Sequence, residues 1–309
     1  MIFAPTASGK TALTRELFSP SSSHFILNAE IISADSQSVY KKMDIGTAKP
    51  DSQLCKEIPH HLINLVEPDV QFTVADFIEN ADKSCKKIYE KGKIPVVCGG
   101  TGFYIKNFLF GLPPTPESSE TIRNQLQKRI QTEGNAALYA ELSLIDFESA
   151  KKIHQNDSYR ICRALEVFYT TGKTRSSYKI EQKLREQYDF LFIILEPPRD
   201  LLFKRISDRV NLMFEQGLED EIIRLKNDGY NENSPGMKAI GYREWFLESD
   251  KEKIKSAIKH NSCKYAKKQF TYIRDINFGE KIIYKAEEKD ILVVQSLIKD
   301  FIKKCNIEY

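Results

Sequence analysis

The chain has 309 residues, of which 41% are hydrophobic and 29% are charged, and its formal net charge is +3. This composition is typical of a folded globular protein, and it excludes a disordered chain and a strong polycation. No apolar run approaches the ~20 residues of a membrane span, and the N-terminus lacks the pattern of a secretion signal, so we expect a cytoplasmic protein without membrane contact. The six cysteines are scattered without zinc-site spacing, which predicts free thiols.

The first third of the chain alternates between short apolar runs and helical patterns. Strands are expected at residues 1–3, 30–33, 61–65 and 94–98, and helices at residues 10–17 and 74–91. Such alternation is typical of a parallel, doubly wound sheet. The first strand is shorter than the ~5 residues usual for a strand, which a native start upstream of Met1 would explain.

The pattern changes after the proline-rich segment 111–116. The sequence is then polar and helical to about residue 178, with apolar residues at helical spacing around Leu126 and Leu165. A strand is expected again at residues 189–195, followed by helices at 200–228 and 251–274, a strand at 282–284 and a C-terminal helix. The sequence therefore predicts an α/β fold, a P-loop NTPase-like parallel sheet flanked by helices. Its core, residues 1–116 and 184–309, encloses a helical insertion, residues 117–183.

A phosphate-binding loop joins the first strand to the first helix. Its residues are Ala4, Pro5, Thr6, Ala7, Ser8, Gly9, Lys10 and Thr11, which match the pattern G-x-x-x-x-G-K-[ST] except at Ala4. Backbone amides and the helix dipole bind phosphate oxygens, Lys10 adds a positive charge, and the Thr11 hydroxyl can ligate Mg²⁺. Such loops are typical of nucleotide-binding proteins, usually ATP-binding ones. Alanine at position 4 is acceptable if its backbone does not need a positive φ.

Three further groups follow predicted strands or lie on helices nearby. Asp35 follows a strand and could be a general base or a metal ligand, or only a turn residue. Thr101, in the glycine-rich segment 99–102, could contact a phosphate or cap a helix. Arg205 and Arg209 share one helix face, where they could bind a diphosphate or pair with the nearby Asp208 or Glu215.

Residues 250–275 are strongly basic, with eight Lys or Arg side chains against three acidic ones and several aromatics between them. A basic helix of this kind can follow a nucleic-acid backbone. Composition alone, however, favours a solvated helix face. The histidines have no partners at metal-ligand spacing, so we expect structural or surface roles for them.

Taken together, these segments resemble the tRNA dimethylallyltransferases. Besides the phosphate-binding loop, the resemblance rests on residues 33–37, 43–50, 59–61, 75–77, 99–104, 156–157, 160–167, 240–244 and 267–270. The block 43–50 distinguishes this family from other P-loop proteins. The C-terminal zinc finger of eukaryotic relatives is missing, which indicates the bacterial type.

The resemblance implies a monomeric enzyme that uses Mg²⁺, dimethylallyl diphosphate and tRNA. It would transfer the dimethylallyl group to N6 of adenosine 37, beside the anticodon. Asp35 would be the general base, Thr101 and Arg209 would complete the catalytic set, and Thr6, Gly9, Lys10 and Thr11 would hold the diphosphate. The resemblance also implies tRNA contacts by Asp35, Ser36, Gln37, Ser38, Thr101, Arg123, Tyr159, Arg160, Ile161, Cys162, Arg163, Lys238, Ala239, Ile240, Gly241, Tyr242 and Arg243.

Two other functions compete with this one. A small-molecule or nucleoside kinase would also combine a P-loop with a carboxylate such as Asp35. The helical insertion and the block 43–50 speak against a kinase. A non-catalytic RNA-binding P-loop protein would fit the basic helix but would not depend on Asp35.

Overall fold

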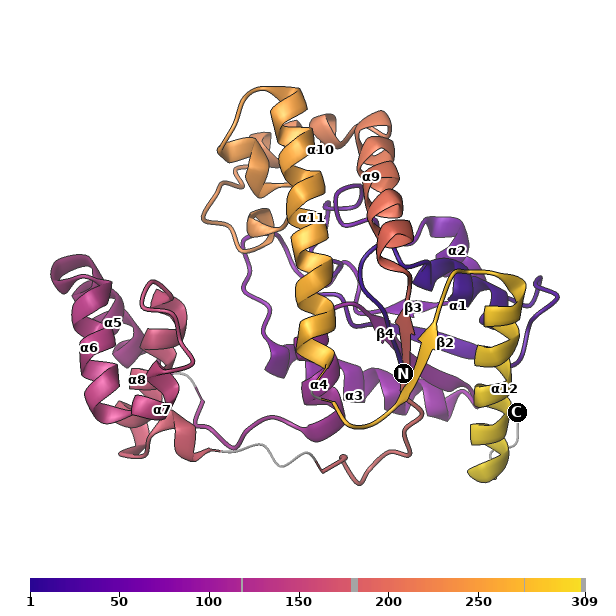
Figure 1. The fold of residues 1–309 in the computed structure, drawn as a ribbon, viewed down its shortest axis with the longest axis horizontal. Helices are drawn as coiled ribbons and strands as arrows, with labels where there is room; N and C mark the ends of the chain where they lie inside the picture. The colour runs from indigo at the N-terminus through magenta and orange to yellow at the C-terminus, as the bar shows by residue number, and fades with distance from the viewer. Residues whose placement is uncertain (118, 179–182, 275, 307–309) are drawn as a thin grey trace. The chain divides into compact units, whose positions relative to one another are not determined.

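The computed structural model describes residues 1–117, 119–178, 183–274 and 276–306 (Figure 1). The chain forms two compact units, one made of Met1–Phe108 and Glu186–Tyr309 and the other of Leu109–Arg185. The predicted insertion, residues 117–183, lies inside the second unit, which begins earlier, within a helix that precedes the proline-rich segment. Among the described helices, none is both long and apolar enough to span a membrane. All six cysteines are free thiols, as predicted.

The first unit is built on one sheet of six parallel strands in the order β3-β2-β4-β1-β5-β6. The strands are β1 (Ile2–Phe3), β2 (Ala29–Ser33), β3 (His60–His61), β4 (Ile94–Gly99), β5 (Ile193–Glu196) and β6 (Glu280–Ile283). The parallel α/β fold predicted from the sequence is confirmed. The prediction for the third strand was wrong beyond His61, because Leu62 and Asn64 have positive φ angles of 62° and 54°, which extended strands do not adopt.

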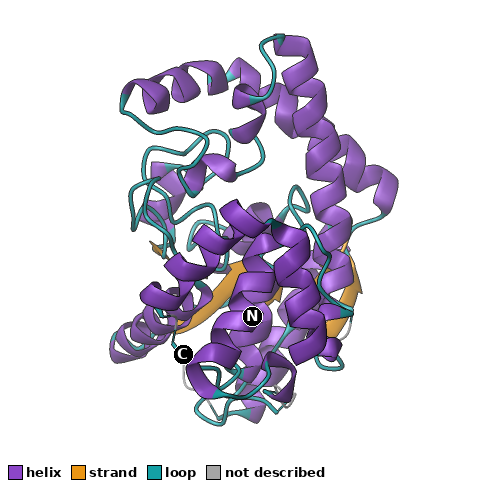
Figure 2. Cartoon of the chain, turned by 90° about the vertical axis from the view of Figure 1, so that its left-hand side faces the viewer, coloured by secondary structure: helices purple, strands orange, loops and turns teal. Residues whose placement is uncertain are grey.

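Helices cover both faces of this sheet (Figure 2). The helices of the first unit are α1 (Lys10–Phe18), α2 (Ser52–Glu57), α3 (Val74–Glu90), α4 (Gly102–Phe110), α9 (Arg199–Glu215), α10 (Leu218–Asn227), α11 (Lys251–Ile273) and α12 (Glu288–Lys304). Of these, α3 packs against β2 and β4, whereas α9 packs against α10 and α11. Apolar side chains of α1 and α12, such as Leu13 and Val294, share one core with the strands. The helix predicted over residues 200–228 is two helices, because Gly217 between them has a φ of 90°.

The second unit contains helices and loops but no strand among its described residues. The helices are α5 (Glu120–Glu133), α6 (Asn135–Ile145), α7 (Phe147–Ala150), α8 (Ser158–Thr171) and the short 3₁₀ helix η1 (Arg175–Ser177). Leu126, Leu138, Leu142, Ile161 and Leu165 form its own apolar core. This unit therefore buries apolar surface independently of the sheet.

Candidate active site

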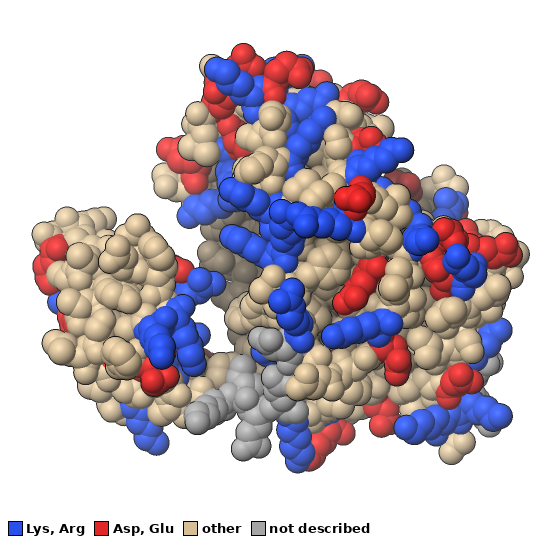
Figure 3. Space-filling model, in the orientation of Figure 1, with Lys and Arg blue, Asp and Glu red and all other residues tan. Residues whose placement is uncertain are grey.

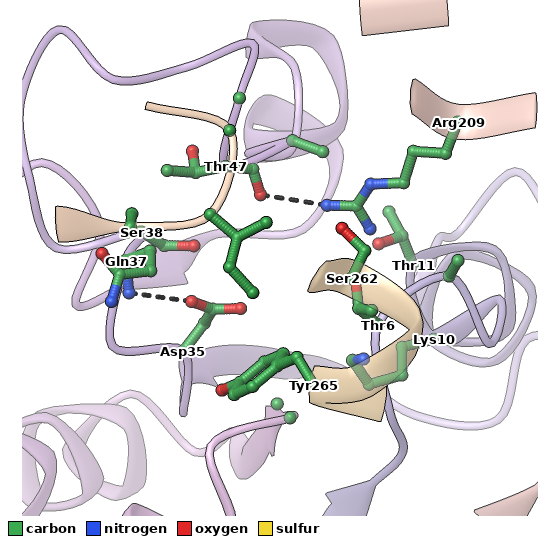
Figure 4. A pocket seen from close by; sticks show the side chains of 18 of the residues that line it. Thr6, Lys10, Thr11, Asp35, Gln37, Ser38, Thr47, Arg209, Ser262 and Tyr265 are labelled. Carbon is green, nitrogen blue, oxygen red and sulfur yellow. Dashed lines mark hydrogen bonds between the residues drawn. The ribbon is translucent and has the colours of Figure 1, made fainter. Parts of the chain in front are cut away.

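The predicted site residues of the first unit meet where neighbouring strands end. β2, β4 and β1 are adjacent in the sheet, and their carboxyl ends lead into the Asp35 loop, the Gly99–Thr101 segment and the P-loop. Ligands of open α/β sheets bind at this edge. The three segments, together with α9 and α11, line a pocket of about 640 Å³ (Figure 4). In this view Asp35 and Tyr265 lie on one side, and Lys10, Thr11 and Arg209 on the other.

The P-loop combines left-handed residues with side chains that bind its backbone groups. Ala7 and Gly9 are left-handed, with φ angles of 59° and 93°, whereas Ala4 is completely buried and is not among the described residues with positive φ. The substitution of the usual first glycine by Ala4 is therefore compatible with the loop. The Lys10 ammonium donates to the carbonyl oxygens of Ala4 and Pro5, both at 2.8 Å. Burial lowers the pKa of Lys10 from 10.5 to about 8.

Thr101 connects the Asp35 loop to the end of β4. Its hydroxyl accepts a hydrogen bond from the Ser36 amide at 2.9 Å, and its amide donates to the Ala34 carbonyl at 3.1 Å. The Asp35 carboxylate accepts from the Gln37 amide at 2.8 Å. Thr101 directly precedes α4, and its carbonyl accepts from the Ile105 amide at 3.1 Å, so it takes the helix-capping position considered from the sequence. A contact between Thr101 and a phosphate stays a prediction. Its hydroxyl also fixes the loop that carries Asp35.

Two polar groups beside Asp35 could contact a bound base. Among the described residues, the side-chain oxygen of Gln37 is buried and accepts no hydrogen bond. Such an atom is costly unless a ligand donates to it. Burial, together with the negative charge of Asp35, raises the pKa of Tyr265 to about 12. Its phenol group is therefore neutral at physiological pH.

The two arginines of α9 differ in their surroundings. Arg209 points into the pocket and donates to the Thr47 carbonyl at 3.2 Å (Figure 4). Burial lowers the pKa of Arg209, and the Asp35 carboxylate opposes this effect. Arg205 donates to the carbonyls of Ser8 and Lys285 at 3.4 and 2.7 Å, so it holds the P-loop backbone, and it also lines the pocket. Both arginines thus bond to backbone carbonyls rather than to the carboxylates considered from the sequence.

The loop formed by residues 43–50 is held in place by Glu221, a residue that was not predicted from the sequence. Glu221 of α10 is 2% exposed, and its carboxylate accepts from the amides of Asp44 and Ile45 at 2.9 Å and of Gly46 at 3.2 Å. It also accepts from the Tyr242 hydroxyl at 2.7 Å. This loop presents the Thr47 carbonyl to Arg209. The sequence did contain one sign of this role, because Glu221 lies among the buried residues of α10, between Leu218 and Leu225.

Replacing Glu221 by alanine should lower the free energy of unfolding by about 3 kcal/mol, because three amides and a hydroxyl lose a buried acceptor. The matched control is Glu219→Ala on the same helix. Glu219 makes an exposed ion pair with Lys251, so its loss should cost less than about 1 kcal/mol. Urea unfolding measures both values. Equal effects would contradict the role assigned to Glu221.

The residues predicted to bind tRNA are placed in different environments. Ser36, Gln37, Ser38, Lys238, Ala239, Ile240, Gly241 and Arg243 all line the pocket. Tyr242 is fully buried against Glu221, and Ile161 and Cys162 lie in the core of the second unit, so these three side chains do not face solvent. Tyr159 and Arg160 are exposed, whereas Arg163 pairs with Glu166 at 2.8 Å and Arg123 is half-buried. A tRNA-contact role for each of these residues stays a prediction.

The fold and the pocket define a P-loop α/β protein that is suited to hold a phosphorylated ligand beside a carboxylate. A family model described as IPP transferase matches residues 38–276. A tRNA dimethylallyltransferase from Geobacter sulfurreducens is 40% identical over 279 residues, which cover 89% of this chain and 88% of that relative. The chain therefore belongs to the IPP transferase family.

Solved structures agree with this assignment. The crystal structure of full-length tRNA isopentenylpyrophosphate transferase from Bacillus halodurans matches with a TM-score of 0.68 and 32% identity, over 98% of this chain and 96% of that one. A eukaryotic dimethylallyltransferase acting on tRNA matches with a TM-score of 0.82 and 28% identity, over 98% of this chain and 79% of that one. The kinase alternative is not favoured by these relatives.

Proposed function

We propose that this protein transfers a dimethylallyl group from dimethylallyl diphosphate to N6 of adenosine 37 in tRNA, releasing diphosphate and forming N6-isopentenyladenosine. The observation that carries the proposal is one pocket in which Asp35 faces a phosphate-binding loop and Arg209. The names of the relatives support transfer of a dimethylallyl group to tRNA. We further propose that the protein acts as a cytoplasmic monomer.

In this reaction a C–N bond forms between N6 and the first carbon of the dimethylallyl group, while the C–O bond to the diphosphate breaks. Asp35 takes the proton that N6 loses, because an exocyclic adenine amine is a weak nucleophile that needs a base within hydrogen-bond reach. The electron pair of the broken bond stays with the diphosphate. The P-loop amides, Lys10 and Arg209 stabilise this developing negative charge without rearranging. Thr101 keeps the Asp35 loop in place through its bond to Ser36.

The chemistry of this site fits a magnesium ion that would bind together with the diphosphate. The described residues contain no group of three His, Cys, Asp or Glu side chains that could hold a metal. The hydroxyl of Thr11 lines the pocket beside Lys10, and hydroxyl and phosphate oxygens are ligands that Mg²⁺ prefers. Thr11 would therefore be its protein ligand. The bound ion would help to neutralise the leaving diphosphate.

The basic helix α11 is suited to bind the tRNA backbone. Lys and Arg side chains gather on the face of the first unit that carries α9 and α11 (Figure 3). Lys264, Lys267 and Lys268 are exposed, while Ser262 and Tyr265 of the same helix line the pocket. One helix thus offers cations to solvent on one side and polar groups to the site on the other.

Replacing Lys264, Lys267 and Lys268 by alanine should reduce the slope of log K against log salt for tRNA binding by roughly 2 to 3, because fewer counterions are released. Filter binding at several salt concentrations measures the slope. The control variant replaces three exposed lysines of α12 by alanine, Lys299, Lys303 and Lys304. The slope for this variant should equal that of wild type. An unaltered slope in the α11 variant would exclude this helix as the tRNA surface.

The direct test incubates the protein with unmodified tRNA, Mg²⁺ and dimethylallyl diphosphate. Mass spectrometry of the digested nucleosides should then reveal isopentenyladenosine. Parallel reactions replace dimethylallyl diphosphate by ATP, with nucleosides as acceptors. Phosphoryl transfer without prenylation would favour the kinase, and tRNA binding without any product would favour a non-catalytic RNA-binding protein.

A further inference from the structure

Gln269 of α11 joins two segments of the site that lie far apart in sequence. Its side-chain oxygen accepts a hydrogen bond from the Thr6 amide in the P-loop at 3.1 Å, and its side-chain nitrogen donates to the Gly100 carbonyl after β4 at 2.7 Å. The partners fix the orientation of the amide group, because a backbone N–H can only donate and a carbonyl can only accept. Gln269 is 5% exposed, and its bond to Gly100 is buried whereas its bond to Thr6 is partly buried.

The glycine-rich segment after β4 is shaped to admit this side chain. A Cβ atom added to Gly100 would lie 2.5 Å from the Gln269 side-chain nitrogen and 3.0 Å from the Ala4 carbonyl oxygen. One added to Gly99 would lie 2.2 Å from the Ala34 carbonyl oxygen, just before Asp35. The two glycines therefore have different tasks. Gly99 allows β4 to pack closely against the Asp35 loop, and Gly100 makes room for Gln269 beside the P-loop.

Gln269 also fixes which part of Thr6 can face a ligand. The Thr6 amide is committed to Gln269, whereas its side chain points into the pocket near Thr11 and Ser262 (Figure 4). Thr6 directly precedes Ala7, which has the left-handed φ of 59°. A hydrogen bond at this point holds the first turn of the loop, from which the following amides project.

We propose that Gln269 is a positioning residue for prenyl transfer, an inference that rests on the proposed function. It ties the P-loop to the end of β4, so that the diphosphate is held at a fixed distance from Asp35. Small errors in this distance slow a transfer reaction strongly, because the attacking and leaving atoms must stay aligned. Gln269 itself contributes no proton and no charge to the reaction.

Two variants test this role. Gln269→Met has a similar length but makes neither bond, and it should lower kcat/KM for dimethylallyl diphosphate about tenfold or more while KM for tRNA changes little. Gln269→Glu keeps the acceptor for Thr6, but its carboxylate repels the Gly100 carbonyl unless it is protonated. Burial raises the pKa of such a carboxyl group. The activity of Gln269→Glu relative to wild type should therefore rise as the pH falls from about 8 to about 6.

The control is Gln295→Met on α12, which removes a glutamine that donates to the His24 carbonyl; neither residue lines the pocket. Thermal unfolding establishes that each variant is folded. If wild type makes isopentenyladenosine and Gln269→Met matches its kcat/KM, or if the Gln269→Glu ratio does not change with pH, the inference is wrong. If wild type makes no product, the proposed function fails instead. In that case calorimetry of inorganic diphosphate binding tests whether Gln269 positions the P-loop. We expect Gln269→Met to bind diphosphate more weakly than wild type, and equal affinity would contradict this role.

Discussion

Replacing Asp35 by alanine should lower the single-turnover rate of prenyl transfer by about 10²-fold or more, while tRNA affinity stays close to that of wild type. The expectation follows from the position of the carboxylate, which faces the pocket from the loop after β2. Without it, the proton of the adenine amine has no acceptor as the new C–N bond forms. Rapid-quench measurement of isopentenyladenosine gives the rate, and filter binding gives the affinity.

A second substitution separates chemistry from loop structure. Asp35→Asn keeps an oxygen that can accept from the Gln37 amide, a bond of 2.8 Å in this structure, but it is no longer a carboxylate base. We expect it to be nearly as slow as Asp35→Ala. Asp208→Asn, an exposed position on α9, serves as the control. Loss of tRNA affinity with an unchanged single-turnover rate would mean that Asp35 binds the substrate without acting as the base.

Replacing Lys10 by methionine should lower kcat/KM for dimethylallyl diphosphate by about 10²-fold or more, because a charge that stabilises the leaving diphosphate is removed. The pH dependence gives an independent measurement. Since the pKa of Lys10 in the free protein is lowered to about 8, the side chain is charged below this pH and neutral above it. The affinity of wild type for inorganic diphosphate should therefore fall roughly tenfold per pH unit above pH 8.

The same titration on Lys10→Met corrects for ionisation of the ligand. Only the wild-type curve of affinity against pH should bend near pH 8. The difference between the two curves measures the effect of Lys10 ionisation on diphosphate binding. Because Lys10 also donates to the carbonyls of Ala4 and Pro5, thermal unfolding of the variant is measured in parallel. Parallel curves for the two proteins would show that Lys10 does not contact the diphosphate.

Much of the site could be predicted because its signals are local. The P-loop is one continuous segment, and its strand, turn and helix follow directly in sequence. Asp35 and Thr101 each follow an apolar run, and strands of a parallel sheet end at one edge. The strand limits were less predictable. β3 ends at His61 because the backbone of Leu62 has a positive φ angle. A run of apolar residues in the sequence does not indicate such a turn.

Other parts of the site arise only from contacts between distant segments. Glu221 and Gln269 each bond to backbone groups more than 160 residues away, and the sequence around them does not specify these partners. Arg205 holds the P-loop through the Ser8 carbonyl, although its spacing to Asp208 and Glu215 equally suggested surface ion pairs. The burial of Tyr242, Ile161 and Cys162 also follows from packing, which the periodicity of short segments does not specify.

By itself, the sequence determined the parallel α/β class, the phosphate-binding loop and the carboxylate opposite it, because hydrophobic period and loop chemistry are properties of continuous segments. Only the tertiary structure decided how these parts are held at working distance. Glu221 fixes the loop that meets Arg209, and Gln269 fixes the P-loop against Gly100. The physical reason is that a buried amide or carbonyl needs a partner, and the chain supplies these partners from helices whose approach depends on the whole fold.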